Sequence, residues 1–281
     1  MERLEQVPFA LMGVVNVTPD SFSDRGRFLE RKAAVAHGVA LAREGAALVD
    51  VGGESTRPGA LPVSGEEELA RVVPVVEGLL AADVEAAVSV DTSKAVVAAR
   101  ALAAGASFIN DVTALRGDPD MASVVAQSDA DCCLMHMLGE PRTMQTNPRY
   151  QDVVSEVKGF LEERLSFAVA QGIVEQRIVL DPGIGFGKTA EHNLELLRRL
   201  DELLELGRPL LVGTSRKSFI GKLTGRPVDQ RLAGTIATNL LAFMQGARIF
   251  RVHEVAPVLD ALKVAAATVS RPWARRTSST T

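Results

Sequence analysis

The chain has 281 residues, of which 47% are hydrophobic, so it is long enough to bury a substantial core. Its 31 basic and 35 acidic residues give a net charge of −4, which argues against nucleic-acid binding, since that function needs clustered positive charge. No apolar stretch reaches the roughly eighteen residues that a membrane-spanning helix needs. The N-terminal sequence also lacks the pattern of a secretory signal. We therefore expect a cytoplasmic protein that binds neither nucleic acid nor a membrane.

Short apolar runs alternate with longer amphipathic stretches along the chain. The runs are rich in Val, Ile and Leu without polar alternation, which is typical of strands covered on both faces of a parallel sheet. Eight strands are expected, over residues 9–15, 47–51, 87–90, 108–110, 132–135, 178–180, 209–212 and 248–252. The adjacent Cys132 and Cys133 fall in one of these runs, and we expect small buried side chains there rather than a disulfide or a zinc site.

The stretches between these runs have helical periodicity. Ser64, followed by Glu66 and Glu67, is a typical start signal for a helix. Helices are expected over residues 33–42, 64–80, 94–103, 118–127, 153–172, 191–206, 231–245 and 255–267. Eight strand–helix units predict one domain, residues 1–281, with a (β/α)8 TIM-barrel core over residues 8–268 and a frayed polar tail at 270–281. An open doubly wound sheet is the alternative, but eight near-equal units favour a closed barrel.

Polar side chains lie near the end of every expected strand or directly after it, which places them together at the carboxyl end of the barrel. They are Asn16, Thr18 and Asp20; Asp50, Thr56 and Arg57; Asp91; Asn110 and Asp111; His136; Asp181; Ser215 and Lys217; and Arg251 and His253. Burying such groups without partners costs a few kcal/mol each, so this distribution indicates an active site. A single Asp could still be a turn acceptor, residues 214–217 could be a capped helix start, and His136 is interpreted as structural.

The polar residues fall into two chemical groups. The first offers acceptors for a flat heterocycle with several N–H donors, such as a pterin, together with a lysine that can donate to a ring atom. Its members are Asp91, Asn110, Asp181 and Lys217. The second combines amide, hydroxyl and positive charge, which suits a phosphate and, at the amide, a hard cation such as Mg²⁺. Its members are Asn16, Thr56, Arg57, Arg251 and His253, although His253 could also be structural.

The glycine-rich residues 181–188 lack the spacing of a dinucleotide fingerprint or a P-loop, and they indicate a tight turn or a mobile loop. Together with the other motifs, this segment resembles the sequence motifs of the dihydropteroate synthases, the folate-pathway enzymes that sulfonamides inhibit. The resemblance rests on residues 16–24 and 50–59, and it continues through residues 89–94, 109–111, 134–137, 181–188, 215–218 and 251–253. The sequence departs from the family at Arg25, which stands where a glycine is common.

The resemblance implies a transferase that joins 6-hydroxymethyl-7,8-dihydropterin pyrophosphate to p-aminobenzoate and releases pyrophosphate. Early cleavage of the C–O bond would precede attack by the arylamine. The resemblance also implies Mg²⁺ as cofactor, inhibition by sulfonamides, a homodimer, and closure of the loops after the first two strands over the substrates.

Site residues are implied in the same way. The pterin would be bound by Asp91, Asn110, Met135, Asp181, Lys217 and Arg251. The p-aminobenzoate would be bound by Thr56, Arg57, Pro58, Phe186, Ser215 and Lys217. The pyrophosphate would be bound by Asn16, Thr56, Arg57, Arg251 and His253, with Asn16 also on the metal. The residues with a catalytic role would be Asp91, Asp181, Lys217, Arg251 and His253.

Three other functions remain open from the sequence. A pterin-dependent methyltransferase would use the same barrel and the same pterin residues, although the motifs at 55–59 and 215–218 favour the synthase. A non-catalytic pterin-binding paralogue would keep binding and lose turnover. A Schiff-base aldolase could use Lys217 as its nucleophile, which borohydride trapping would reveal.

Overall fold

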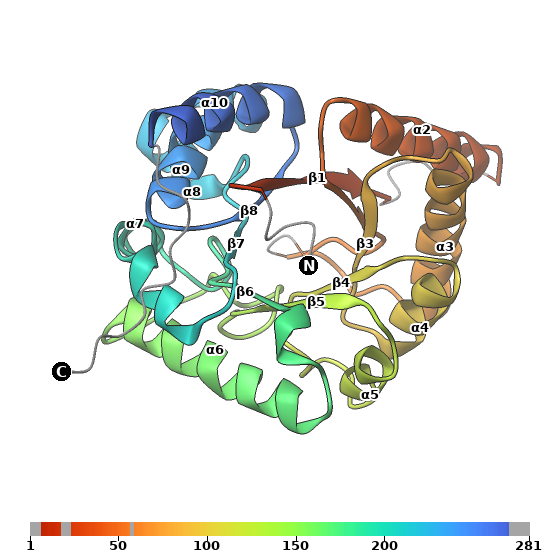
Figure 1. The fold of residues 1–281 in the computed structure, drawn as a ribbon, viewed down its shortest axis with the longest axis horizontal. Coiled ribbons are helices and arrows are strands. Elements are labelled where there is room, and N and C mark those ends of the chain that lie inside the picture. The colour runs from red at the N-terminus through yellow and green to blue at the C-terminus, as the bar shows by residue number, and fades with distance from the viewer. Residues whose placement is uncertain (1–6, 18–23, 57–58, 270–281) are drawn as a thin grey trace.

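The computed structural model describes residues 7–17, 24–56 and 59–269 (Figure 1). Its strands are β1 (Ala10–Asn16), β2 (Leu48–Gly52), β3 (Ala87–Asp91), β4 (Phe108–Asp111), β5 (Asp131–Met135), β6 (Ile178–Asp181), β7 (Leu211–Val212) and β8 (Ile249–Val252). Each of the expected strands is present, with only small shifts at its ends. The apolar runs therefore predicted the strands well, because both faces of each strand are covered.

The strands form one parallel sheet that curves around on itself. Neighbours pair in the order β6-β5-β4-β3-β2-β1-β8-β7. Between β6 and β7 an isolated bridge joins Leu180 to Leu210, and the Leu180 N–H donates to the Pro209 carbonyl at 3.0 Å. The helices surround this nearly closed barrel (Figure 1). The predicted TIM barrel is confirmed, and the alternative of an open doubly wound sheet is wrong.

The helices follow the strands in turn. They are α2 (Asp24–Arg43), α3 (Gly65–Ala81), α4 (Ala95–Ala103), α5 (Met121–Ala126), α6 (Val153–Ala170), α7 (Ala190–Arg198), α8 (Ser218–Thr224), α9 (Leu232–Met244) and α10 (Val255–Thr268), with 3-10 turns η1 (Glu175–Arg177), η2 (Leu200–Leu206) and η3 (Val228–Gln230). Ser64 caps α3 as predicted, since its hydroxyl accepts from the Glu67 N–H at 3.2 Å. In the described part of the chain no helix is long and apolar enough to cross a bilayer.

The helices differ from expectation in several places. The first one, α2, begins at Asp24 and not at residue 33. The stretch at 191–206 is interrupted at Arg199, whose φ of −113° and ψ of 28° separate α7 from η2. The short α8 was expected only as the alternative of a helix start at 214–217, because its residues are too few to show a period. The backbone of Arg25 lies in the first turn of α2, so this departure from the family falls in a helix and not in the first loop.

Alternate strand residues face either the helices or the barrel interior, as strand geometry requires. The residues between sheet and helices form the larger core, which includes Val49, Val51 and Leu134. The inward residues of the lower barrel form a second buried cluster, which we call the apolar floor. It consists of Ala10, Met12, Leu48, Phe108, Cys133, Val179, Leu211 and Ile249. Both cysteines are buried and free, as predicted.

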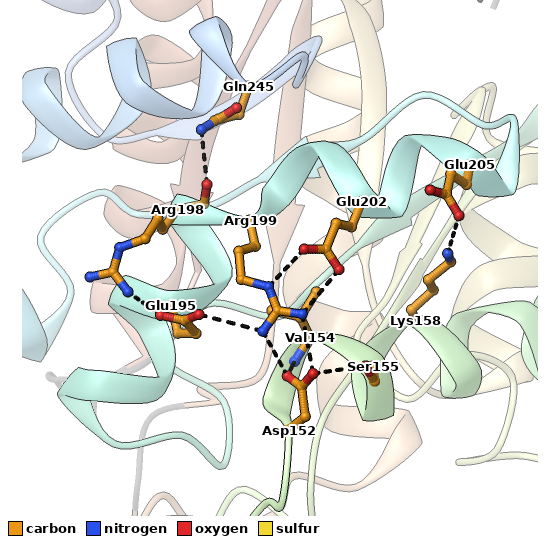
Figure 2. Close-up of polar contacts among 10 residues, drawn as sticks. All are labelled: Asp152, Val154, Ser155, Lys158, Glu195, Arg198, Arg199, Glu202, Glu205 and Gln245. Atoms are coloured by element: carbon orange, nitrogen blue, oxygen red, sulfur yellow. Dashed lines mark hydrogen bonds and ion pairs between the residues drawn. The ribbon is translucent and has the colours of Figure 1, made fainter.

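An ion-pair network joins α6, α7 and η2 at the surface (Figure 2). The guanidinium of Arg199 donates to both carboxylate oxygens of Asp152, at 3.0 and 3.1 Å, and to both of Glu202, at 2.7 and 3.0 Å. Asp152 also caps α6 by accepting from the Val154 N–H at 3.1 Å. The hydrogen bonds from Arg199 lower the pKa of Asp152 to about 2. One arginine therefore ties the start of α6 to the end of α7.

Candidate active site

The inward face of the barrel becomes polar above the apolar floor. Strand register places Asp91 beside Asn110, and Met135 beside Asp181, on neighbouring strands. Arg251 stands two residues after the floor residue Ile249 on β8, so it faces the interior as well. The acceptors predicted for a heterocycle and the predicted phosphate-binding arginine therefore meet at the carboxyl end of the barrel.

Arg251 reaches from β8 to two carboxylates on other strands. Its Nε donates to Oδ2 of Asp50 at 2.7 Å, and its Nη2 donates to Oδ2 of Asp91 at 2.8 Å. Burial raises the pKa of Asp91 to about 7, although the guanidinium opposes that shift. Burial would lower the pKa of Arg251, but the two carboxylates outweigh it and raise that pKa. The site thus combines a permanent positive charge with a carboxyl that titrates near neutral pH.

Asp50 is a site residue to which the sequence analysis gave no role. It is fully buried and accepts from Ser89 Oγ at 2.6 Å and from Asn110 Nδ2 at 3.1 Å, in addition to Arg251. A signal was available, because a carboxylate on the same strand face as the buried Leu48 requires several partners.

Asp111, by contrast, is a turn acceptor. Its carboxylate accepts from the backbone N–H groups of Thr113 and Leu115, at 2.8 and 2.7 Å, and from the Thr113 hydroxyl at 2.7 Å. It therefore orders the turn after β4, which is the alternative reading of a strand-end aspartate.

Asp181 lies at the end of β6, where it is 5% exposed. Burial raises its pKa to about 6, while the Gly183 N–H, which donates to Oδ1 at 2.7 Å, and Lys217 pull that pKa down. Gly183 has a φ of +68°, and a Cβ there would lie 1.8 Å from the His136 carbonyl oxygen. Glycine is therefore required for the tight turn that brings this N–H to the carboxylate.

Lys188 stabilises the same turn through hydrogen bonds from its side chain. Its buried Nζ donates to the carbonyls of Gly183 and Phe186, both at 3.0 Å, and lies 2.8 Å from Nδ1 of His136. Burial lowers the pKa of Lys188 to about 7, and burial beside Lys188 lowers the pKa of His136 to about 2. His136 therefore supports the turn as a neutral ring, which agrees with its structural interpretation.

Lys217, Phe186 and Met135 form one side of the site. The Lys217 ammonium lies 4.0 Å from the centroid of the Phe186 ring. Burial, and then Arg251, lower the pKa of Lys217 to about 8, while Asp181 opposes the shift. Met135 is buried in a cluster with Val112, Met137 and Met144, against which Phe186 packs. The last two methionines were not predicted, although the methionine-rich stretch after β5 was a visible signal.

Ser215, which follows β7, contacts His253, which follows the neighbouring strand β8. Its Oγ lies 2.9 Å from Nδ1 of His253 and accepts from the His253 N–H at 3.2 Å. The N-cap position of α8 is Lys217, whose side chain makes no capping hydrogen bond. Ser215 therefore does not cap a helix, and this alternative interpretation of Ser215 is wrong. The Arg216 side chain donates to Glu254 at 2.8 Å.

The first two loops are only partly described. Asn16 ends β1 with an exposed side chain, opposite Gly52 of β2. Thr56 is half-buried in the second loop, whereas the predicted site residues Arg57 and Pro58, and Thr18 and Asp20 of the first loop, lie outside the described residues. In the ranges that the structure describes, no group of three or more His, Cys, Asp or Glu side chains could hold a metal.

The comparisons with known proteins identify the family. The chain matches the family model "Pterin binding enzyme" over residues 12–253. It is 46% identical over 260 residues to the dihydropteroate synthase of Haemophilus influenzae, covering 92% of this chain and 94% of that protein. It is 47% identical to the dihydropteroate synthase of Escherichia coli K12, covering 92% of each chain. The chain belongs to the dihydropteroate synthases.

Solved dihydropteroate synthases share the fold. The enzyme of Xanthomonas albilineans with 4-aminobenzoic acid is 52% identical, with a TM-score of 0.86 over 94% of both chains. That of Yersinia pestis with a sulfonamide drug is 46% identical, with a TM-score of 0.88 over 93% of this chain and 94% of that chain. A Xanthomonas albilineans structure with 7,8-dihydropteroate is 46% identical, with a TM-score of 0.82 over 94% of both chains. The resemblance to the dihydropteroate synthases, and the transferase class that it implied, are confirmed.

Proposed function

We propose that this chain condenses 6-hydroxymethyl-7,8-dihydropterin pyrophosphate with p-aminobenzoate to 7,8-dihydropteroate and releases pyrophosphate. Membership of the dihydropteroate synthases supports the reaction. The observation that carries it is the meeting of buried acceptors, Asp91, Asn110 and Asp181, with the cations Arg251 and Lys217 above an apolar floor. A pterin offers N–H donors to the acceptors, and its pyrophosphate offers negative charge to the cations.

The pterin lies deepest in this proposal. Asp91, Asn110 and Asp181 accept from its ring N–H groups, Lys217 donates to a ring atom, and Met135 and Arg251 lie against its faces. A buried carboxylate can accept two parallel N–H bonds from a guanidine-like edge. The charged carboxylates also stabilise the positive charge that spreads over the pterin when the exocyclic C–O bond breaks.

The pyrophosphate leaves from the side of Arg251 and His253. A guanidinium has enough N–H donors to hold Asp50 and Asp91 and still donate to a phosphate oxygen. Asn16, with Thr56 and Arg57 from the second loop, completes the contacts to this group. The exposed amide of Asn16 is an oxygen ligand that would fit Mg²⁺. When bound, Mg²⁺ would neutralise charge on the leaving group.

The p-aminobenzoate binds nearer the mouth, against Phe186, Ser215 and Lys217, with Thr56, Arg57 and Pro58 of the second loop. Its amine attacks the methylene carbon after the C–O bond has broken and then loses a proton, so no covalent bond to the protein forms. Sulfonamides resemble p-aminobenzoate, so they are expected to compete for this position. A Schiff base on Lys217 has no role in this reaction.

A coupled assay tests the proposal. The protein is supplied with the pterin pyrophosphate and p-aminobenzoate, with and without Mg²⁺, and both pyrophosphate and dihydropteroate are measured. Equal release of both products, dependent on p-aminobenzoate and Mg²⁺, is expected. Neither product, together with pterin binding by calorimetry, would identify a non-catalytic paralogue. Neither product, together with methyl transfer from separately supplied methyltetrahydrofolate to a corrinoid protein, would identify a methyltransferase.

A homodimer is part of the same proposal. Leu241 and Met244 on α9 are each 58% exposed, and Val264 on the adjacent α10 is 68% exposed. Apolar side chains on neighbouring helices suit a contact with a second copy. Light scattering of the purified protein should give twice the 29.9 kDa mass of the chain. The cytoplasmic location stays a prediction.

A further inference from the structure

Asp50 lies between the apolar floor and the side chains that would touch a pterin. It follows the floor residue Leu48 by two positions on β2, and it is fully buried. Its carboxylate accepts from Ser89, Asn110 and Arg251 at 2.6, 3.1 and 2.7 Å. Two of these three donors belong to the proposed substrate-binding set, and they come from strands on opposite sides of β2 in the sheet order.

The contact to Asn110 decides which end of that amide a ligand meets. An amide has a donating end, Nδ2, and an accepting end, Oδ1, whereas a carboxylate beside a guanidinium only accepts. Asp50 therefore takes Nδ2 of Asn110, at 3.1 Å, and leaves Oδ1 as the end turned away from Asp50. Without Asp50, nothing in this contact would prevent the amide from turning by half a rotation and presenting a donor instead.

The contact to Arg251 fixes a second group. Asp50 holds its Nε at 2.7 Å while Asp91 holds its Nη2 at 2.8 Å, so the plane of the guanidinium is set by two carboxylates on different strands. A planar group held at two nitrogens has little freedom to rotate. If Asp50 is removed, only Asp91 of these two carboxylates still holds the Arg251 guanidinium.

We propose that Asp50 is the positioning residue that sets the hydrogen-bonding pattern of the pterin site, by presenting the Asn110 oxygen and holding the Arg251 guanidinium. The site then offers acceptors at Asp91, Asn110 and Asp181, and it selects heterocycles whose facing edge carries N–H donors. This inference rests on the proposed function, because it concerns the same site. It adds a specificity-determining residue that need not touch the substrate.

Two substitutions separate orientation from charge. In Asp50→Asn, the amide oxygen can still accept from Asn110 and Arg251, and the new NH₂ can donate to the Ser89 hydroxyl, which also accepts. This variant keeps the pattern and loses the charge. In Asp50→Ala, the acceptor is lost and the Asn110 amide can turn. Ser89→Ala is the matched control, because it removes one donor to Asp50 without touching Asn110 or Arg251.

The measurement is the preference between two ligands. Pterin carries a 2-amino donor, and lumazine carries a 2-oxo acceptor at the same place, so the ratio of their Kd values by calorimetry reports the pattern. We expect Asp50→Ala to reduce the preference for pterin by about tenfold or more, as a changed hydrogen bond to a charged or buried partner does. Asp50→Asn and Ser89→Ala should keep the preference within about threefold of the wild type.

A folded Asp50→Ala variant with the wild-type preference would overturn the inference and leave Asp50 a structural residue. If Asp50→Ala does not fold, Asp50→Ser decides the question. The serine hydroxyl is one bond shorter than the Asp50 carboxylate, so it loses the contact to Asn110 Nδ2 while filling more of the space than alanine does. The preference for pterin should fall as in Asp50→Ala, and a folded Asp50→Ser variant with the wild-type preference would overturn the inference. Turnover of the wild type in the coupled assay is read separately, so failure of the reaction does not imitate failure of this inference.

Discussion

The exchange of Asp181 for asparagine should make the protein more stable and a weaker pterin binder. The substitution keeps the shape of the side chain and an oxygen that can accept from the Gly183 N–H, which donates at 2.7 Å. What it removes is the charge. Opposite changes in stability and affinity would show that a buried carboxylate is kept for the ligand and not for the fold.

The size of the stability gain follows from the pKa. Burial raises the pKa of Asp181 from 3.8 to about 6, and two pKa units correspond to about 3 kcal/mol. Because the folded pKa is the higher one, the folded state binds the proton more tightly and stability falls as pH rises from 4 to 6. At pH 8 the variant should gain up to about 3 kcal/mol, which for 281 residues at about 2.1 cal/mol/K each is a Tm rise of about 5 °C.

Thermal unfolding at pH 8 and pH 5, together with calorimetric titration with the pterin, measures both effects. The Tm gain should shrink at pH 5, where the wild-type carboxyl is largely protonated, and pterin affinity at pH 8 should fall about 100-fold with the lost charge-assisted bonds. Asp111→Asn is the control for binding, since that carboxylate accepts from turn donors, so pterin affinity should stay unchanged. A Tm that does not rise at pH 8, or an unchanged pterin affinity, refutes the reasoning for Asp181.

Further outcomes are expected elsewhere in the site and fold. The value of kcat/KM for the pterin substrate should rise toward pH 7 as Asp91 ionises and fall above pH 8 as Lys217 loses its proton. Lys217→Arg should remove the fall at high pH, and a pH profile unchanged by that variant contradicts the assignment. Asn16→Ala should lower kcat more than pterin affinity, and full turnover with unchanged binding would reject its place on the pyrophosphate and the metal. A sulfonamide should raise the KM for p-aminobenzoate without changing kcat, so a mixed pattern in steady-state kinetics would speak against a shared position. Arg199→Met should lower Tm by breaking the pairs with Asp152 and Glu202 while leaving KM unchanged, which melting curves and kinetics can test together.

The strands and the placement of most candidate site residues could be predicted because both depend on local order. A strand covered on two faces is recognised by its apolar run, and the residue that follows it lies at one end of a parallel barrel whatever its distant partners are. This reasoning alone predicts that Asp91, Asn110 and Asp181 lie together at the carboxyl end of the barrel. Their burial and their pKa values required the structure, because those depend on neighbours more than one strand away.

The remaining assignments depend on contacts between distant residues, which single-sequence patterns do not show. Asp50 and Asp111 are both carboxylates on strands, yet one faces the barrel interior and the other accepts hydrogen bonds from its own turn. What distinguishes them is whether each lies an even or an odd number of residues after the floor residue on its own strand. That number is known only when the exact start and register of the strand are known. Lys188 looked like the end of a glycine-rich loop, although its amine organises that loop through two carbonyls and an imidazole.

The apolar floor has a consequence for kinetics. Since the described barrel interior is filled below Asp50 and Asn110 by buried side chains such as Met12 and Phe108, a molecule can reach the deep acceptors only from the carboxyl end. A molecule seated near Ser215 would then block the path to the deeper position, whereas a deep molecule leaves the outer position accessible. With the two substrates placed as proposed, the pterin has to bind first and the arylamine second, and the joined product has to leave by the route of entry.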